Sequence, residues 1–328
     1  MNESKYKVSV IVPAKNTGKY IKKCLDSLLY QTIASIEVIV IDDGSQPSLA
    51  SILSGYRQID NLVYLRNEIT LGPGAARNKG LEIARGKYIG FCDSDDWVDL
   101  ELFETVVNNM ENHDADIGVF SVIREYDYTP KERCYLSYFD KHHSLHSEVA
   151  IHILSGVYNI GIKLHNACWN KLFRNSFLKN IKVRFEEGIY FQGILFNVRT
   201  FLYARKIICT PGAAYHHYKR LNSIVQSFDV KHIRDFGESY TKMKSYFEEK
   251  GVFEQYRYDF YSLCDDYMNL IVKEIFEFVQ SEHERKQYLR QLLNTYISLV
   301  SIDEYFEYAS AERIRHHIQP HIHDTTLY

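Results

Sequence analysis

Two acidic clusters and one polar turn are the residues of this 328-residue chain with the greatest chemical potential. Asp42-Asp43-Gly44-Ser45 and Asp93-Ser94-Asp95-Asp96 each follow a short apolar run, as does Pro13-Ala14-Lys15-Asn16. Mg²⁺ and Mn²⁺ take oxygen ligands, commonly one or two carboxylates together with substrate phosphates. A metal held by Asp93 and Asp95 could neutralise a departing diphosphate. The simpler alternative is that these aspartates cap a helix, and Asp96 is expected to be only a cap or a buried partner.

The surrounding sequence alternates strand-like and helix-like segments. Continuous apolar runs predict strands at residues 8–12, 38–41, 62–65 and 88–92. Apolar residues at helical spacing predict helices within residues 21–29, 49–56, 75–84 and 100–110, the last one capped by Asp99. This alternation predicts an α/β fold with a mostly parallel sheet and helices on both faces. In such sheets ligands bind beyond the carboxyl ends of the strands, where the three polar loops should converge.

A glycine-rich turn precedes the third predicted helix. Gly72-Pro73-Gly74-Ala75-Ala76-Arg77 partly matches a dinucleotide-binding fingerprint, with Asp93 near the expected acidic position. Arg77 replaces the third glycine, and residues 67–71 separate the turn from its strand, so the match is weak. We interpret the turn as a helix start whose N–H groups and Arg77 face an anion, with a plain helix start as the alternative.

Together these segments resemble the family 2 glycosyltransferases of the GT-A fold. The resemblance rests on residues 8–16, 38–45, 72–80 and 86–96, and it continues in residues 168–173 and 217–224. It implies a GT-A domain over residues 1–225, and the residue spacing described below predicts a helical domain over residues 226–328. It also implies inverting transfer of a sugar from a nucleotide diphosphate donor, most often a UDP-sugar, to an acceptor hydroxyl.

The resemblance assigns roles to individual residues. Donor-binding positions would be Pro13, Asn16, Asp42, Asp43, Arg77, Asp93, Ser94, Trp169, Lys171, Lys219 and Arg220. Among them, Asp43 would accept a hydrogen bond from uracil, and Lys219 with Arg220 would stabilise the leaving diphosphate. Trp169 would form a floor under the sugar, with core packing as the alternative.

The resemblance also implies Mn²⁺ or Mg²⁺ as cofactor. Asp95 would ligate the metal, with Asp93 beside it on the same loop. Either His216 or His217 would complete the metal shell, and a structural role for these histidines is the alternative.

The pattern breaks at the general base. In the family, a Glu-Asp pair opens a helix after a Phe-x-Glu-Gly-like string, and its Asp takes the acceptor proton. Here residues 184–188 fit, but Gln192-Gly193 stand at the Glu-Asp position, and neither can accept a proton. General-base assistance contributes roughly 10²- to 10⁴-fold in rate. The donor pocket can therefore persist while fast transfer is lost.

Four explanations remain open for this substitution. The enzyme is active with a substitute base, for which Glu187 and Glu186 are the nearest carboxylates. Alternatively, it transfers slowly or to an easily deprotonated acceptor, or it binds a sugar nucleotide without catalysis as a partner subunit. The substitution could also have been introduced deliberately to trap a complex. We favour an active or ancestrally active transferase, and an NAD-type oxidoreductase has only the partial glycine pattern in its favour.

The last third of the chain is rich in aromatic residues. Residues 229–328 contain 11 Tyr and 7 Phe, too many for a flexible linker. Helical spacing of Cys264, Tyr267, Met268, Ile271, Ile275 and Phe278, and of Leu289, Leu292, Leu293 and Tyr296, predicts a small helical bundle. Its apolar face would pack on the GT-A domain, on a second subunit to form a homo-oligomer, on an acceptor or on a membrane surface. The histidine-rich residues 316–323 are interpreted as a solvated tail.

Composition restricts the partners and the cellular location. A net charge of −3 provides no nucleic-acid footprint, and six widely spaced cysteines favour reduced, buried thiols. Apolar runs are strand-sized, so we expect a cytoplasmic protein, with the inner face of a membrane as a further option. The expected acceptor is a glycan, a glycolipid or a glycoprotein, as part of surface polysaccharide or glycoconjugate synthesis.

Overall fold

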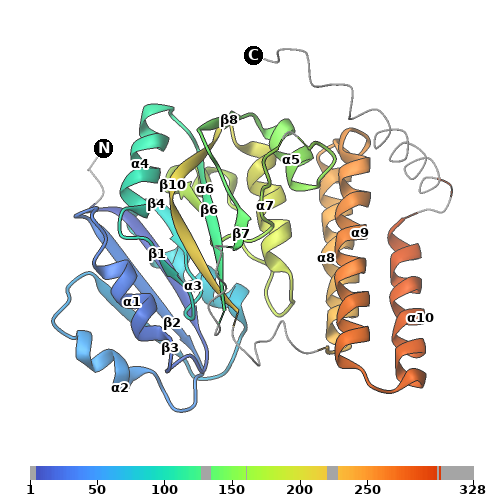
Figure 1. The fold of residues 1–328 in the computed structure, drawn as a ribbon, viewed down its shortest axis with the longest axis horizontal. Helices are drawn as coiled ribbons and strands as arrows, with labels where there is room; N and C mark the ends of the chain where they lie inside the picture. Colours follow the sequence, from blue (N-terminus) through green and yellow to red (C-terminus); the bar gives the residue numbers. More distant parts are fainter. Residues whose placement is uncertain (1–4, 127–133, 160, 220–227, 301–302, 304–328) are drawn as a thin grey trace. The chain divides into compact units, whose positions relative to one another are not determined.

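The computed structural model describes residues 5–126, 134–159, 161–219, 228–300 and 303 (Figure 1). Internal contacts divide the chain into two compact units. The first unit comprises residues 1–154 and 158–223, and the second comprises residues 155–157 and 224–328. All the strands in the described ranges belong to the first unit, whereas the last three helices belong to the second.

One mixed sheet forms the frame of the first unit. Its order is β3-β2-β1-β4-β9-β6-β10-β5, with β7 paired to β6 and β8 paired to β10. The strands are β1 (Tyr6–Ala14), β2 (Ile36–Asp43), β3 (Leu62–Asn67), β4 (Gly86–Phe91), β5 (Trp97–Val98), β6 (Ile117–Tyr126), β7 (Cys134–Ser137), β8 (His143–Leu145), β9 (Lys171–Arg174) and β10 (Ile207–Lys219). Strands β3, β2, β1 and β4 are parallel to one another, and β6 is parallel to β10. Strand β9 runs antiparallel to β4 and β6 and joins these two parallel groups. The predicted α/β fold with a mostly parallel sheet is therefore confirmed.

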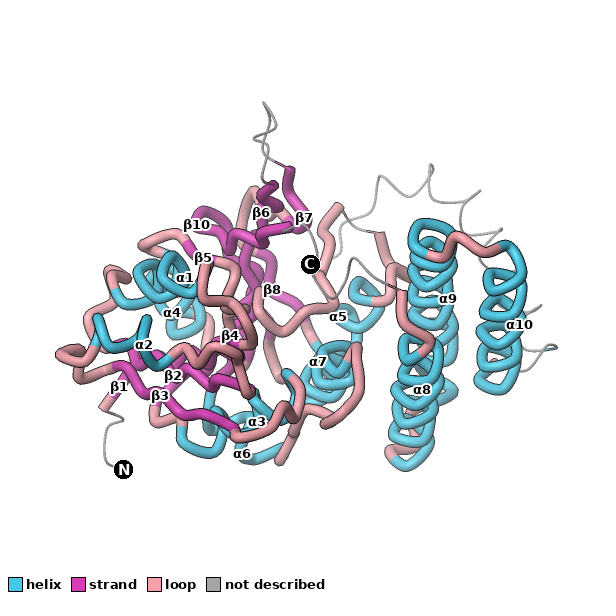
Figure 2. The backbone as a smooth tube through the Cα atoms, turned by 90° about the horizontal axis from the view of Figure 1, so that it is seen from below, coloured by secondary structure: helices cyan, strands magenta, loops and turns pink. Residues whose placement is uncertain are grey.

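Helices cover both faces of this sheet (Figure 2). They are α1 (Ile21–Leu29), α2 (Ala50–Leu53), the 3₁₀ helix η1 (Ser54–Tyr56), α3 (Pro73–Ile83), α4 (Leu102–Asn112), α5 (Ser147–Leu154), α6 (Asn175–Ile181) and α7 (Gln192–Tyr203). Helix α3 packs so closely on β1 that a Cβ added at Gly80 would lie 2.4 Å from Cγ2 of Ile11. Helix α4 packs on the opposite face, where Phe103 lies against Gly90 of β4.

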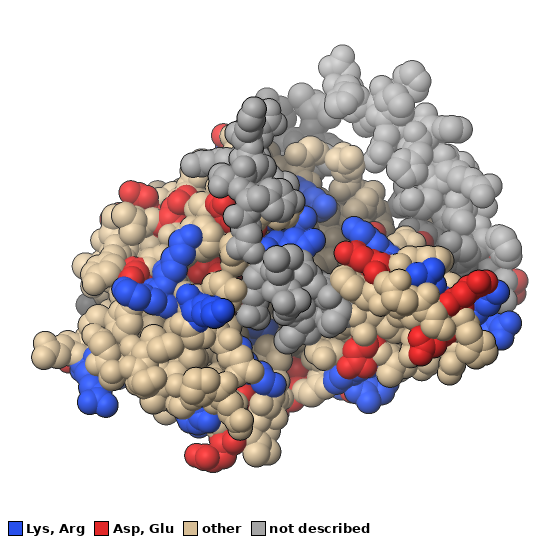
Figure 3. Space-filling view, turned by 60° about the horizontal axis from the view of Figure 1, so that its bottom comes forward, with Lys and Arg blue, Asp and Glu red and all other residues tan. Residues whose placement is uncertain are grey.

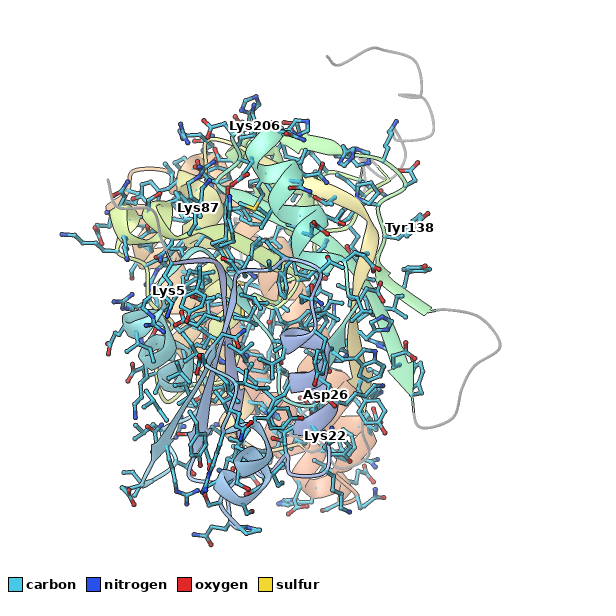
Figure 4. All side chains as sticks on the ribbon, turned by 90° about the vertical axis from the view of Figure 1, so that its left-hand side faces the viewer. Lys5, Lys22, Asp26, Lys87, Tyr138 and Lys206 are labelled. Carbon is cyan, nitrogen blue, oxygen red and sulfur yellow. The ribbon has the colours of Figure 1, made fainter. Side chains whose placement is uncertain are left out.

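The packing explains why the apolar runs of the sequence form strands. All eight residues of β2 are buried, as expected for a strand covered on both faces. The predicted helix over residues 21–29 coincides with α1, where Lys22 and Asp26 also form an ion pair one turn apart, with 2.7 Å between Nζ and Oδ2 (Figure 4). The helix predicted over residues 49–56 divides into α2 and η1.

The predicted Asp99 cap of α4 is wrong. The helix begins at Leu102 with Glu101 at its N-cap and no side-chain capping bond. The Asp99 carboxylate instead accepts a hydrogen bond from the Ala214 N–H of β10 at 2.8 Å. Leu100, expected on the buried helix face, precedes the helix and is 50% exposed. A tertiary partner 115 residues away outcompetes the local capping position.

The second unit consists of helices α8 (Lys231–Glu249), α9 (Phe253–Phe278) and α10 (Glu282–Leu299), which lie side by side in Figures 1 and 2. The C-terminal helical region predicted from the sequence is therefore confirmed. Its core contains Phe236 and Tyr240 of α8 and Phe260 and Cys264 of α9, all fully buried. Leu293, expected on the apolar face of α10, is 51% exposed. The histidine-rich residues 316–323 lie outside the described residues.

Surface and cysteine properties agree with the composition. Basic and acidic side chains are interspersed on the face shown in Figure 3. Five cysteines of the described part, at positions 24, 92, 168, 209 and 264, are buried and free, as predicted. Within the described ranges, no helix is both long and apolar enough to cross a membrane.

Candidate active site

The loop after β2 is organised by two neighbouring carboxylates. Asp43 accepts hydrogen bonds from Asn67 Nδ2 at 2.8 Å and from the N–H groups of Leu71 and Gly72 at 2.9 and 2.8 Å. These bonds fix the start of α3, where Gly72 has a φ of 93°, a value that favours glycine. A carboxylate offers about four lone-pair positions, so Asp43 retains capacity to accept one more hydrogen bond.

Asp42 has a different environment. Its side chain is fully buried and accepts hydrogen bonds from Tyr64 Oη and Arg66 Nη1, both at 2.8 Å, and from the Ser45 N–H. Burial opposes ionisation, but the hydrogen bonds from Ser45, Tyr64 and the Leu49 N–H lower the pKa of Asp42 overall. These contacts favour a role in positioning the loop rather than in contacting a donor.

The polar turn after β1 is connected to the same loop. The Asn16 N–H donates to Ser45 Oγ at 3.0 Å, and Asn16 Oδ1 accepts from the Gln46 N–H at 2.9 Å. Pro13 is half-buried at the end of β1, beside Ile41 of β2 in the strand register. The turn and the first acidic cluster therefore lie together at one edge of the sheet, as predicted from the strand ends.

The second acidic cluster, residues 93–96, is held from two sides. On one side, Arg77 Nη2 of α3 forms an ion pair with Asp93 Oδ1 at 2.7 Å. Arg77 is buried, and its Nε has no hydrogen-bond partner within the described ranges. The glycine-rich turn thus opens a helix whose Arg77 is paired with Asp93, and the anion expected at this helix start stays a prediction.

On the other side, Tyr215 of β10 anchors the cluster. Its hydroxyl donates to Asp96 Oδ2 at 2.5 Å and accepts from the Asp93 N–H at 3.0 Å. The other Asp96 oxygen accepts from the Tyr218 N–H at 2.7 Å. Burial raises the pKa of Tyr215, so the hydroxyl keeps the proton that it donates. Asp96 is therefore a buried partner, as predicted, while Asp93 and Asp95 remain half-buried.

An aromatic stack lies beside this anchor. The Trp169 ring stacks on both Tyr215 and His217, with centroid distances of 4.6 and 5.3 Å and interplanar angles of 15° and 13°. Trp169 is 7% exposed, so most of its indole is used in packing. The packing alternative therefore describes most of this residue, and its role as a floor under the sugar stays a prediction.

Lys171 holds the segment of residues 165–170, which contains Trp169. Its side chain is fully buried, and Nζ donates to the carbonyls of His165 and Ala167 and to Asn170 Oδ1, at 2.6–2.8 Å. Burial lowers the pKa of Lys171 to about 7. These three internal bonds indicate that Lys171 positions the loop rather than contacting a donor.

The two adjacent histidines point to opposite faces of β10. His216 Nδ1 lies 2.8 Å from Glu125 Oε1, and His216 Nε2 lies 2.9 Å from Asp99 Oδ1. Although burial opposes it, these hydrogen bonds raise the pKa of His216. In contrast, His217 Nδ1 is buried with no hydrogen-bond partner in the described part of the chain, and burial lowers its pKa. A neutral imidazole with an unpartnered nitrogen suits a metal better than one bound between two carboxylates.

The position of the missing base lies at the start of α7. Gln192 is buried in the first turn, and the nearest atom to a Cβ added at Gly193 would be the Asn166 carbonyl oxygen at 3.5 Å. That distance is an ordinary contact, so the backbone at this position has room for a Cβ. Of the two candidate substitute bases, Glu187 accepts a hydrogen bond from Asn78 Nδ2 and Glu186 is ion-paired with Arg199, both at 2.8 Å.

The remaining predicted donor residues differ in their exposure to solvent. Ser94 is buried within the second acidic cluster, and Lys219 is exposed at the end of β10. Arg220 lies outside the described residues. Tyr215 was missed by the sequence analysis, although its place two residues before His217 puts it on the same strand face.

The described side chains near the second acidic cluster could form only part of a metal shell. In the described ranges, no group of three or more His, Cys, Asp and Glu side chains is arranged to hold a metal ion. A smaller protein shell still suits Mg²⁺ or Mn²⁺, because these ions keep waters and share substrate phosphates. Asp95 on the acidic loop and the unpartnered His217 Nδ1 fit such an incomplete shell.

The fold and the site define an α/β protein whose candidate ligand site lies at the carboxyl edge of its sheet. The chain matches glycosyl transferase family 2 over residues 9–181, which is more than half of its length. It belongs to this family, as the sequence resemblance predicted.

Individual relatives agree with this assignment. The glycosyltransferase GlyG of Streptococcus pneumoniae is 30% identical over 241 residues, covering 72% of this chain and 78% of GlyG. The cholesterol galactosyltransferase of Borreliella burgdorferi is 26% identical over 254 residues, covering 76% of this chain and 70% of that protein. The structure of S. aureus TarS 1–349 in complex with UDP-GlcNAc superimposes with a TM-score of 0.58 at 24% identity. That superposition covers 93% of this chain and 79% of TarS 1–349, and it supports the fold.

The Tyr215 anchor generates a first prediction. Tyr215→Phe removes the hydroxyl that holds Asp96 and the Asp93 N–H, so we expect the affinity for Mn²⁺ in the presence of UDP to fall about tenfold. Isothermal titration calorimetry measures this affinity. Tyr88→Phe is the matched control, because the Tyr88 hydroxyl is buried without a hydrogen-bond partner in the described residues. Equal Mn²⁺ affinity in the two variants would contradict the anchoring role.

The Trp169 loop generates a second prediction, on pH. Burial, followed by the charge of Lys171, lowers the pKa of His165 from 6.5 to about 3. As pH falls below 6.5, His165 therefore binds a proton in the unfolded chain but not in the folded chain, and the free energy of unfolding decreases. We expect this histidine to account for a loss of about 2.5 kcal/mol in unfolding free energy between pH 7 and pH 4.5.

Urea unfolding between pH 7 and pH 4.5 measures this effect. His165→Gln should lose less stability over this range than the unmodified chain, whereas the exposed His146→Gln should follow the unmodified chain. Parallel curves for His165→Gln and the unmodified chain would show that His165 does not carry the acid sensitivity.

Proposed function

We propose that this protein transfers a sugar from a UDP-sugar to an acceptor hydroxyl with inversion at the anomeric carbon. The observation that carries the proposal is the Asp93–Asp96 loop, fixed between Arg77 and Tyr215 beside the unpartnered His217 nitrogen. Membership of glycosyl transferase family 2 supports it. The TarS complex with UDP-GlcNAc is a precedent for the donor class in a protein of the same fold.

The nucleoside would bind over the ends of β1 and β2. Pro13 and Asn16 would line this pocket, and Asp43 would use its remaining acceptor capacity for the uracil ring. Asp42 and Arg66 would hold the loop beneath it. Asp93 and Ser94 would face the ribose, with Arg77 keeping the Asp93 carboxylate in place.

The diphosphate would lie beside the acidic loop. Asp95 and His217, with Asp93 adjacent, would hold Mn²⁺ or Mg²⁺, and His216 is left to its carboxylate partners. When bound, such an ion neutralises charge on the leaving diphosphate. Lys219, and Arg220 beyond the described residues, would add positive charge on the same side. Trp169 would support the donor sugar with the exposed part of its indole.

The acceptor proton is the weak point of this arrangement. Gln192 and Gly193 provide no base at the start of α7. Of the two substitute carboxylates we choose Glu187, because Glu186 is ion-paired with Arg199. We propose slow transfer, with deprotonation left to Glu187 or to solvent. The second candidate function, a disarmed sugar-nucleotide-binding partner, is favoured by this same Gln192-Gly193 substitution.

The proposal extends to the wider biological role. We propose a role in surface polysaccharide or glycoconjugate synthesis, with a glycan, glycolipid or glycoprotein acceptor. Residues 1–225 would form the transferase domain and residues 226–328 a helical domain, a division supported by the two compact units. We place the protein in the cytoplasm or at the inner membrane face, and propose that the helical domain mediates oligomer formation or peripheral membrane contact.

Restoring the base tests the function directly. In the presence of Mn²⁺ and a panel of UDP-sugars, Gly193→Asp should release UDP at least about 100-fold faster than the unmodified chain, since it regains a general base. Gly193→Asn is the matched control, with the same shape but no base. A Cβ at position 193, which both variants share, meets no atom closer than 3.5 Å.

Three other results are informative in this assay. Chelation of the metal should abolish release by Gly193→Asp, and Asp95→Ala in that background should do the same. Equal rates in Gly193→Asp and Gly193→Asn would contradict the assignment of this position. Failure of UDP and Mn²⁺ to bind the unmodified chain would contradict the donor site itself.

A further inference from the structure

Three cationic side chains near His217 have no ion-pair partner within the described residues. They are Arg124 of β6, Lys163 of the segment that precedes Trp169, and Lys219 at the end of β10. Lys163 and Lys219 are exposed, whereas Arg124 is half-buried. The Nε of Arg124 is fully shielded from solvent and makes no hydrogen bond to any described residue. A shielded guanidinium nitrogen without an acceptor is costly unless a ligand supplies one.

The strand register places these groups on one face. Arg124 of β6 is paired with His217 of β10, and Tyr126 is paired with Lys219. Paired residues on neighbouring strands share a face, and alternate residues along one strand return to it. Arg124, His217 and Lys219 therefore lie on the face that carries the Trp169 ring, which stacks on His217 at 5.3 Å.

Lys163 reaches the same region from its own segment. Its carbonyl accepts a hydrogen bond from Ser137 Oγ of β7 at 2.8 Å. Ser137 is paired with Val122, two residues before Arg124 on β6. Two residues beyond Lys163, the His165 ring packs on Trp169 with a centroid distance of 5.0 Å. Lys163 is thus fixed by its backbone close to the end of β6.

The neighbouring carboxylates are already engaged elsewhere. Glu125 follows Arg124 but points to the opposite face, where it lies 2.8 Å from His216 Nδ1. Asp93 is paired with Arg77 at 2.7 Å, and Asp99 is paired with His216 at 2.9 Å. These three carboxylates therefore do not neutralise the positive charge that the described residues place on the Trp169 face. Its effect reaches His165, whose pKa is lowered first by burial and then also by Lys171, Lys163 and Arg124.

Arg124 and Lys163 lie apart from the proposed nucleoside pocket, whereas His217 and Lys219 border the proposed diphosphate site. Strand β6 is two strands away from β4, beyond β9, whereas the proposed nucleoside loops follow β1 and β2 on the other side of β4. Lys163 lies three residues before Asn166, whose carbonyl oxygen faces the base position at Gly193. A ligand held by Arg124 and Lys163 would accordingly lie on the acceptor side of the transferred sugar.

We propose that Arg124 and Lys163 form a subsite for a phosphate group of the acceptor. The inference rests on the proposed function, and it narrows the acceptor to a class whose hydroxyl lies near a phosphate, such as a polyol phosphate or a phosphorylated glycan. Arginine offers a planar fork of donors that matches a phosphate, and lysine adds a second charge. A neutral acceptor would leave both cations without a counter-charge.

The test uses sn-glycerol 3-phosphate as the probe and glycerol as its uncharged control. Each is titrated calorimetrically into the full chain, once alone and once with saturating UDP and Mn²⁺. We expect glycerol 3-phosphate to bind in both conditions, glycerol to bind in neither, and the affinity to fall as salt is added. Arg124→Gln and Lys163→Gln should each weaken binding of the probe about tenfold while changing the affinity for UDP less than twofold.

Arg57→Gln is the matched charge control, because Arg57 is exposed beside η1. It should leave both affinities unchanged, and thermal melting of all variants shows that they fold. Unchanged probe affinity in Arg124→Gln and Lys163→Gln would overturn the subsite. A tenfold loss of UDP affinity in Arg124→Gln would also overturn it, since Arg124 would then belong to the donor site. Probe binding without any UDP binding would contradict the donor assignment alone.

Discussion

The hydrogen bonds of the Tyr215 hydroxyl are the constraint on which the rest of the site depends. One phenolic oxygen joins the Asp96 carboxylate and the Asp93 N–H, two groups on the loop that follows β4. The same ring stacks on Trp169, and Trp169 stacks on His217. The acidic loop, the aromatic platform and the candidate metal histidine are thus fixed to β10 as one body. Preorganisation of this kind lets charged groups act on a ligand without first rearranging.

The frame for donor binding and the machinery for transfer occupy different elements. Asp43, Arg77, Asp93 and Tyr215 come from strand ends and α3 and depend on one another through short hydrogen bonds. The proton acceptor, in contrast, depends on a single position at the start of α7, where Gly193 stands. In the proposed function, the substitution at this position therefore affects the proton acceptor and not the residues that would bind the donor. The packing of Gly74 against the Glu186 carbonyl, where an added Cβ would lie 2.3 Å from the oxygen, further shows that α3 and the segment before α7 fit closely.

Local sequence patterns predicted the elements well and the contacts less well. The β1 and β2 runs and the α1 periodicity depend on near neighbours in sequence, so their strands and helix were predicted correctly. The Asp99 cap failed because its real partner, Ala214, is 115 residues away. Tyr215 was missed for the same reason, since Asp96 is 119 residues away. To choose between His216 and His217 as the candidate metal ligand, one must know which face of β10 each side chain occupies. The burial of Lys171 became visible only with the fold of the loop that it supports. Family resemblance assigns a residue type to a site, but only packing separates a residue that touches a ligand from one that holds its neighbour.

The central claim is that the loop of Asp93–Asp96, fixed by Tyr215, forms a metal-dependent nucleotide site with His217 as the histidine ligand. The most direct measurement is an anomalous diffraction map, recorded at the manganese edge, of crystals of the unmodified chain grown with UDP and Mn²⁺. The account predicts one strong peak within bonding distance of Asp95 and His217 Nδ1, next to the UDP diphosphate, with the Tyr215–Asp96 hydrogen bond intact. A peak at His216, or UDP bound at β1 and β2 with no metal beside the acidic loop, would contradict it.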